Sequence, residues 1–198
     1  MPLRARLALM LAGTFILLGA LAVVVFAKSG GDAGGGPGFE GALRPKGIPP
    51  IAFSLKDQDG KTATLAQYRG QPVILTFMYS TCRDTCPLTA QQIKGALDDL
   101  GVSVPTLAIS VDPANDTPLN ARRFVNRQGL TSRMRFLLGT RAQLAPIWKA
   151  YGIEPQTKAF DHSAYVVLVD RNGIQRVGWP VDKLTPEGLA HDLRLLGA

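Results

Sequence analysis

The feature that most limits what this chain can fold into is an uncharged, apolar run of 21 residues, 7–27. At about 1.5 Å per helical residue, the run is long enough to cross a hydrocarbon core about 30 Å thick. Arg4 and Arg6 precede it, so the positive-inside tendency keeps the N-terminus in the cytoplasm and exports whatever follows Lys28. We therefore expect residues 1–28 to form a membrane anchor with a single transmembrane helix.

A cleaved signal peptide is the alternative for the same run, because Val25 and Ala27 fit the small-residue rule before a cleavage site. The run exceeds the roughly 7 to 15 apolar residues usual in a signal peptide, which favours the uncleaved anchor. The sequence has no Arg- and Ser-rich amphipathic leader of the mitochondrial kind. We expect the bacterial inner (cytoplasmic) membrane, with the C-terminal domain in the periplasm.

Composition divides the rest of the chain into a tether and one domain. Residues 29–47 contain the Gly-rich stretch 34–38 and few apolar side chains, which is typical of a flexible linker. Hydrophobic residues make up 46% of the chain and charged residues 19%, which is enough to bury a core and excludes a disordered protein. We expect a flexible tether over residues 29–47 and one folded domain over residues 48–198.

Hydrophobic periodicity predicts alternating strands and helices in this domain. A β-hairpin is expected around residues 57–60, and Pro146 must kink or divide the helix that contains it. The order predicts an α/β, thioredoxin-like fold, a mixed sheet with helices on both faces and an added N-terminal β-hairpin. The expected strands are 73–79, 104–111, 135–138, 164–169 and 173–178, and the expected helices are 87–100, 117–128, 140–151 and 185–196.

The chain has only two cysteines, Cys82 and Cys86, and both lie where a buried strand runs into a helix. Pro87 suits the first helical position, so we expect Cys86 at the N-cap and Cys82 in the loop above it. Both sulfurs would then face the positive end of the helix, which stabilises thiolate. Thiolate is both the nucleophile and the metal ligand, so a redox-active dithiol and a metal site are both possible.

A plain structural disulfide is the simplest alternative for this pair, since such bridges are common in exported domains. A bridge that closes so short a loop removes little chain entropy, which weighs against it. Two thiolates favour Cu(I) or zinc, but a structural zinc site needs four protein ligands, and the sequence has only two histidines.

The two histidines differ in position. His162 lies just before the final hairpin, and in a thioredoxin fold this loop lies against the helix that follows the cysteines. Its imidazole is therefore a candidate third ligand, whereas His191 is expected on a helix surface. Met78 and Met134 are interpreted as core residues and not as thioether ligands.

Several motifs together resemble the Sco/SenC family of copper chaperones, which serve the dicopper centre in subunit II of cytochrome c oxidase. The resemblance covers nearly the whole chain, including the anchor and tether. Its motifs are the cysteine motif at 82–87, the stretch 110–118 and Asp161-His162-Ser163. Many members have proline directly after the first cysteine, where this chain has Arg83.

The resemblance implies that Cys82, Cys86 and His162 bind copper, as Cu(I) or Cu(II), and that Asp112 and Asp161 are acidic residues near the site. It implies delivery of copper to subunit II, and exchange with other periplasmic copper carriers or thiol reductants. Either acidic residue is a candidate to orient His162 through its second ring nitrogen. For Asp116, just before a helix, we expect capping chemistry instead.

An enzyme is the competing function. A membrane-anchored thiol-disulfide oxidoreductase would use Cys82 and Cys86 alone, perhaps on the cysteines of the copper-acceptor site, so the sequence leaves enzymatic activity open. A peroxiredoxin-like peroxidase is a weaker candidate, because no Pro-x-x-x-Thr-x-x-Cys pattern is present.

Arginines at positions 122, 123, 127, 133 and 135 form either a solvated helix face, the favoured interpretation, or a basic face for an acidic partner or anionic lipid. No aromatic interleaving indicates a nucleic-acid partner.

Overall fold

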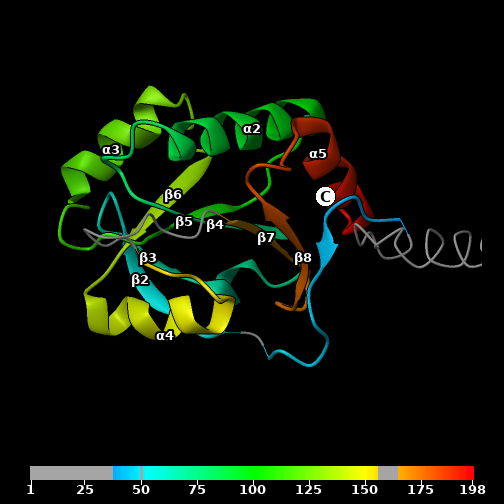
Figure 1. Ribbon diagram of the computed structural model, residues 1–198, viewed down its shortest axis with the longest axis horizontal. Helices are drawn as coiled ribbons and strands as arrows, with labels where there is room; N and C mark the ends of the chain where they lie inside the picture. The colour runs from blue at the N-terminus through cyan, green and yellow to red at the C-terminus, as the bar shows by residue number, and fades with distance from the viewer. Residues whose placement is uncertain (1–37, 50, 156–164) are drawn as a thin grey trace, which may run out of the picture. The chain divides into compact units, whose positions relative to one another are not determined.

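The computed structural model describes residues 38–49, 51–155 and 165–198 (Figure 1). These residues belong to one compact unit, Gly35–Ala198. The predicted transmembrane helix falls outside the described residues. Within the described ranges, no helix is both long and apolar enough to span a bilayer.

One eight-stranded sheet runs through the domain in the order β1-β8-β7-β4-β5-β6-β2-β3. The central strands β4, β5 and β6 are parallel, and the pairs on both sides of them are antiparallel, which confirms the predicted mixed sheet. The strands are β1 (Ala42–Leu43), β2 (Ser54–Asp57), β3 (Thr62–Thr64), β4 (Val73–Met78), β5 (Thr106–Ser110), β6 (Met134–Leu138), β7 (Tyr165–Val169) and β8 (Gln175–Pro180).

Helices cover both faces of this sheet, because the side chains of a buried strand alternate between the two faces. Ile74 and Met78 of β4 enter one apolar cluster with α2, α3 and α5, whereas Leu75 and Phe77 enter a second cluster with α4. Figure 1 shows α4 on the opposite side of the sheet from the other three helices. The helices are α2 (Thr85–Leu100), α3 (Pro118–Arg127), α4 (Arg141–Tyr151) and α5 (Pro186–Leu195), with a 3₁₀ turn, η1 (Leu65–Tyr68).

Helix boundaries follow from local chemistry. The side chains of Thr117 and Thr140 accept hydrogen bonds from the first turns of α3 and α4, as N-cap residues do. Gly101 ends α2 at φ 67°, a left-handed conformation that favours glycine. Of the two expected effects of Pro146, a kink or a division, the division does not occur, because α4 is continuous through that residue. Proline removes one internal hydrogen bond there, and the packing of α4 on the sheet outweighs that loss.

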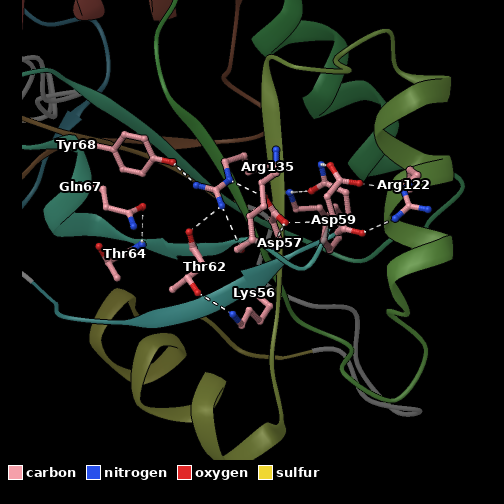
Figure 2. Close-up of polar contacts among 12 residues, drawn as sticks. Lys56, Asp57, Asp59, Thr62, Thr64, Gln67, Tyr68, Arg122 and Arg135 are labelled. Carbon is pink, nitrogen blue, oxygen red and sulfur yellow. Dashed lines mark hydrogen bonds and ion pairs between the residues drawn. The ribbon is translucent and has the colours of Figure 1, made fainter.

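The predicted N-terminal hairpin is confirmed as β2 and β3, and it is held to the sheet by a buried carboxylate (Figure 2). Asp57 accepts from Arg135 Nε at 2.8 Å and from the backbone N–H groups of Asp59 and Lys61. Arg135 also donates to the Tyr68 hydroxyl, at 2.8 Å. One arginine on β6 therefore holds both the hairpin and the turn after it.

Strand β1 lies within residues 29–47, the range that composition assigned to the tether. It pairs with β8, with Ala42 opposite Gly178. Just before it, the backbone N–H groups of Glu40 and Gly41 donate to the buried carboxylate of Asp192, at 2.8 and 2.9 Å. The folded sheet thus begins earlier than the expected boundary near residue 48.

Candidate functional site

The two cysteines lie at the carboxyl end of β4, where the chain turns into α2. Helix α2 begins at Thr85 with Asp84 as its N-cap, so the expected N-cap position of Cys86 is wrong. Cys86 is inside the first turn, and Pro87 follows it there. Proline is tolerated because the first N–H groups of a helix have no internal partner. Cys82 remains in the loop, as predicted, with its N–H donating to the Tyr79 carbonyl oxygen at 3.3 Å.

This arrangement brings the Cys82 sulfur against the first turn of α2. The backbone N–H of Cys86 donates to Cys82 Sγ at 3.3 Å. Both residues carry free thiols and both are buried, but Cys82 keeps 8% of its surface exposed and Cys86 only 1%. Cys82 is therefore the sulfur that a partner or reagent meets first.

The two thiols also differ in pKa, and the less buried one has the lower value. A hydrogen bond from the Cys86 thiol, opposed by burial and supported by the N–H groups of Asp84 and Cys86, lowers the pKa of Cys82 to about 5. Donating that hydrogen bond, together with burial, raises the pKa of Cys86. The expectation that the helix end stabilises thiolate on both sulfurs is therefore wrong. One thiolate and one thiol share a proton at this site.

A buried carboxylate, Asp116, fixes the start of the cysteine loop. One of its oxygens accepts from both the N–H and the hydroxyl of Ser80, each at 2.6 Å, and the other accepts from the Ser110 hydroxyl at 2.5 Å. Burial raises the pKa of Asp116, although these hydrogen bonds oppose the shift. The carboxylate thus joins the ends of β4 and β5 directly before Cys82.

Sequence reasoning missed this role, because it interpreted Asp116 as a helix cap. The cap is Thr117, whose hydroxyl oxygen accepts from Asn120 N–H at 3.2 Å. An acidic residue placed before an N-cap that is already adequate was the signal for a second role. Asp112, which the sequence placed near the site, lies in the turn between β5 and α3. Its carboxylate accepts from the Asn115 side-chain amide at 2.7 Å, which is a contact within that turn.

His162 and Asp161, the other predicted site residues, lie outside the described residues. The described strand that follows them is informative, because β7 begins at Tyr165 and pairs with β4, with Val166 opposite Thr76. Strand β7, which follows these two residues in the sequence, therefore lies beside the strand that leads to the cysteines. Among the described residues, no group of three or more His, Cys, Asp and Glu side chains is arranged to hold a metal ion.

The remaining candidates have structural places. His191 lies on α5, as expected, and its Nε2 is 2.7 Å from the Gly38 carbonyl oxygen. Met78 and Met134 are each 1% exposed within the same apolar cluster, which confirms their interpretation as core residues.

Comparison with known proteins shows which family the chain belongs to. The family described as SCO1/SenC matches residues 45–196, which include both cysteines and His162. The chain belongs to the SCO1/SenC family.

Individual Sco relatives agree with this assignment. The mitochondrial SCO2 homolog of Bos taurus is 30% identical over 146 residues, which are 67% of this chain and 54% of the bovine protein. The chain thus spans little more than half of that relative. Copper-bound ScoI of Bradyrhizobium japonicum is 30% identical, with a TM-score of 0.64 over 74% of this chain and 98% of ScoI.

A third relative supports the fold. BsSco, described as a member of the Sco family of cytochrome c oxidase assembly proteins with a disulfide switch, is 22% identical and has a TM-score of 0.67. It covers 77% of this chain and 95% of its own. The predicted thioredoxin-like architecture of the domain is thereby confirmed.

Proposed function

We propose that this Sco protein carries copper between Cys82, Cys86 and His162 and delivers it to the dicopper centre of cytochrome c oxidase subunit II. The observation that carries the proposal is the buried pair of Cys82 and Cys86, in which the Cys86 N–H donates to the Cys82 sulfur, in a chain that is similar to copper-bound ScoI. Soft thiolates are the ligands that Cu(I) prefers. Because the raised pKa of Cys86 keeps its proton in the free protein, loading copper on both sulfurs must release that proton.

Strand pairing supports His162 as the third ligand. Val166 lies opposite Thr76 on β4, and His162 is only four residues before Val166. Four residues span at most about 14 Å when extended, and Cys82 lies six residues after Thr76, in the loop that follows β4. The imidazole is therefore within reach of the sulfurs, and a nitrogen ligand suits the harder Cu(II) state.

A thiol-disulfide oxidoreductase is the second candidate, and the unequal sulfurs favour it specifically. A thiolate of low pKa attacks a disulfide, and a more deeply buried thiol beside it then resolves the mixed disulfide. Cys82 and Cys86 have these two properties. Such an enzyme needs no imidazole.

Residues 7–27 support a location for either activity. We propose that they anchor the protein in the bacterial inner membrane, with the domain on the periplasmic side, because Arg4 and Arg6 precede an uncharged stretch of membrane-spanning length. Subunit II and other copper carriers or thiol reductants of that compartment would then be its partners.

The change His162→Ala separates the two functions, with His191→Ala as the matched control. We expect the His162 variant to keep two titratable thiols and some Cu(I), but to lose the sulfur-to-copper charge-transfer absorption of the Cu(II) form. Oxidase activity in cells should fall with it. The His191 variant should behave as wild type, because that side chain lies on α5 and contacts the Gly38 carbonyl oxygen.

A dithiol reductase predicts a different pattern. The His162 variant would then reduce a model disulfide at the wild-type rate and support normal oxidase assembly, because the reactivity of Cys82 arises from Cys86 and local N–H groups. Unchanged Cu(II) spectra together with normal oxidase activity would reject the copper-delivery proposal.

A further inference from the structure

A basic groove opens beside the cysteine loop. Its cavity is about 440 Å³, and its lining brings residues of the loop and the start of α2 together with residues of α3. Cys82 and Pro87 lie on one side, and the arginines that line it are Arg83, Arg123 and Arg127. No acidic residue lines this groove within the described part of the chain.

These three arginines differ from three others, on α3, on β6 and in the turn before β6, in having no ion-pair partner among the described residues. Arg122 pairs with Asp59 at 3.0 Å, Arg135 pairs with Asp57, and Arg133 pairs with Asp98. In contrast, the three groove arginines are exposed and form no ion pair with any described residue. Within the described part of the chain, ion pairs thus neutralise Arg122, Arg133 and Arg135 but none of the three arginines that line the groove beside Cys82.

Two exposed apolar side chains are sequence neighbours of residues that line the groove. Leu88, next to Pro87, is 62% exposed, and Leu119, next to the lining residue Asn120, is 51% exposed. Exposed apolar side chains beside a charged cavity are typical of protein interfaces. Among the described residues that line the groove none is aromatic, so they offer no stacking surface of the kind that single-stranded nucleic acids use.

We propose that the groove of Arg83, Arg123 and Arg127 binds an acidic polypeptide segment of a partner and thereby presents the partner's cysteine sulfur to Cys82. The inference rests on the proposed function in one respect, namely that Cys82 is the atom that a partner must reach. It adds what is recognised: carboxylate side chains near the reacting sulfur. Guanidinium groups suit this task because they bind carboxylates in a two-pronged geometry.

Matched peptides test the proposal on the reduced, copper-free domain. Each peptide carries one cysteine as a mixed disulfide with 2-thiopyridine, flanked by aspartates in one peptide and by asparagines in the other. The Cys82 thiolate attacks the peptide sulfur, the disulfide to pyridine breaks, and pyridine-2-thione leaves after taking up a proton. The initial rate of its release measures this first step, whatever Cys86 does afterwards.

We expect the wild-type domain to react about tenfold faster with the acidic peptide at low ionic strength, and this preference should shrink as salt is added. The double change Arg123→Gln/Arg127→Gln should bring the two rates close together. The control Arg122→Gln/Arg133→Gln removes the same charge from paired arginines and should keep the preference. Circular dichroism confirms that each variant is folded.

Equal rates for both peptides in the wild type would overturn the proposal, as would an equal loss of preference in the control variant. Cu(I) titration of the same variants distinguishes the two proposals. If the Arg123→Gln/Arg127→Gln variant loses the preference for the acidic peptide but still binds copper, the groove acts in recognition of the partner. If wild type shows the preference but binds no copper, the groove stands and the copper site fails.

Discussion

The chemistry of Cys82 depends on its partner sulfur more than on the helix to which it leads. The Cys86 thiol and two backbone N–H groups donate to Cys82, and together they outweigh the cost of burying a charge. Its hydrogen bond to Cys82 and its deeper burial raise the pKa of Cys86, and the hydrogen bond with the Tyr79 backbone opposes that shift only in part. A site made of two like residues therefore has one attacking sulfur and one that holds a proton.

Alkylation of the reduced, copper-free domain tests this asymmetry. Because the pKa of Cys82 is lowered to about 5, its thiolate persists as the pH falls until the pH passes that value. Iodoacetamide should therefore modify Cys82 before Cys86, and the rate should reach half its plateau near pH 5, as measured by mass spectrometry of quenched samples. Cys86→Ala removes the main donor, so its half-plateau pH should move up towards the ordinary thiol value. A wild-type midpoint near that ordinary value would contradict the assignment.

Asp116 is a positioning residue for the same sulfur. Asp116→Ala leaves the buried N–H of Ser80 without an acceptor, which costs about 1 to 3 kcal/mol of unfolding free energy. Asp116→Asn keeps an oxygen for Ser80, and its amide can donate to the Ser110 hydroxyl, so stability should largely recover. Urea unfolding measures both variants. The alanine variant should also bind Cu(I) more weakly than the asparagine variant, an effect that a purely structural role would not produce.

At the scale of elements, the β2–β3 hairpin depends on one ion pair. Asp57 is 3% exposed and accepts from Arg135, whereas the neighbouring pair of Asp59 and Arg122 is about half exposed at both ends. Exposed pairs contribute little, but a buried charge that loses its partner is costly. The two pairs in Figure 2 therefore differ in their expected effect on stability.

Arg135→Gln should lower the free energy of unfolding by about 3 kcal/mol, whereas Arg122→Gln should change it by less than about 1 kcal/mol. Both are measured by urea unfolding at neutral pH. An equal effect of the two changes would show that burial of Asp57 is not decisive.

The pH dependence has a definite sign for Asp57. Burial acts to raise the pKa of its carboxyl, but hydrogen bonds from Arg135, Lys61 and Asp59 lower it overall. A carboxyl whose pKa is lower in the folded state stabilises the protein at any pH above its unfolded-state pKa. This stabilisation is lost as the pH falls through the folded-state pKa. The stability difference between wild type and Asp57→Asn should therefore shrink below about pH 4.

At the scale of the whole domain, the stretch just before β1 is tied to the last helix. Asp192 is fully buried and accepts from Glu40, Gly41 and the Trp179 indole N–H. The residues just before β1 are thus held against α5, and we expect residues 38–43 to unfold together with the rest of the domain.

Two shortened versions of the chain test this boundary. A version that begins at Ser29 should be soluble and unfold cooperatively, because it keeps every described element. A version that begins at Ile48 lacks β1 and leaves the Asp192 carboxylate with one remaining donor, Trp179, so its unfolding free energy should be lower by at least about 2 kcal/mol. Equal stability of the two, measured by thermal and urea unfolding, would place the domain boundary after β1.

Local patterns in the sequence were sufficient to predict most elements of the domain. Alternating and helical periodicities mark the strands and helices, and the caps Thr117, Thr140 and Gly101 act on neighbours a few residues away. The cysteine pair, the resemblance to Sco proteins and the prediction of His162 as a ligand also come from short motifs. Such features can be read from the sequence because the interactions that produce them join residues close together in the chain.

Tertiary structure alone decided the features that depend on distant partners. Asp116 reaches Ser80 across 36 positions, and Asp192 reaches Glu40 across 152. Tertiary contacts likewise decided that Arg122 pairs with Asp59, whereas Arg123 and Arg127 form no ion pair with any described residue. The inequality of the two sulfurs arose from burial and from the direction of one hydrogen bond. Composition and spacing do not reveal these contacts, because each joins residues that become neighbours only when the sheet has formed.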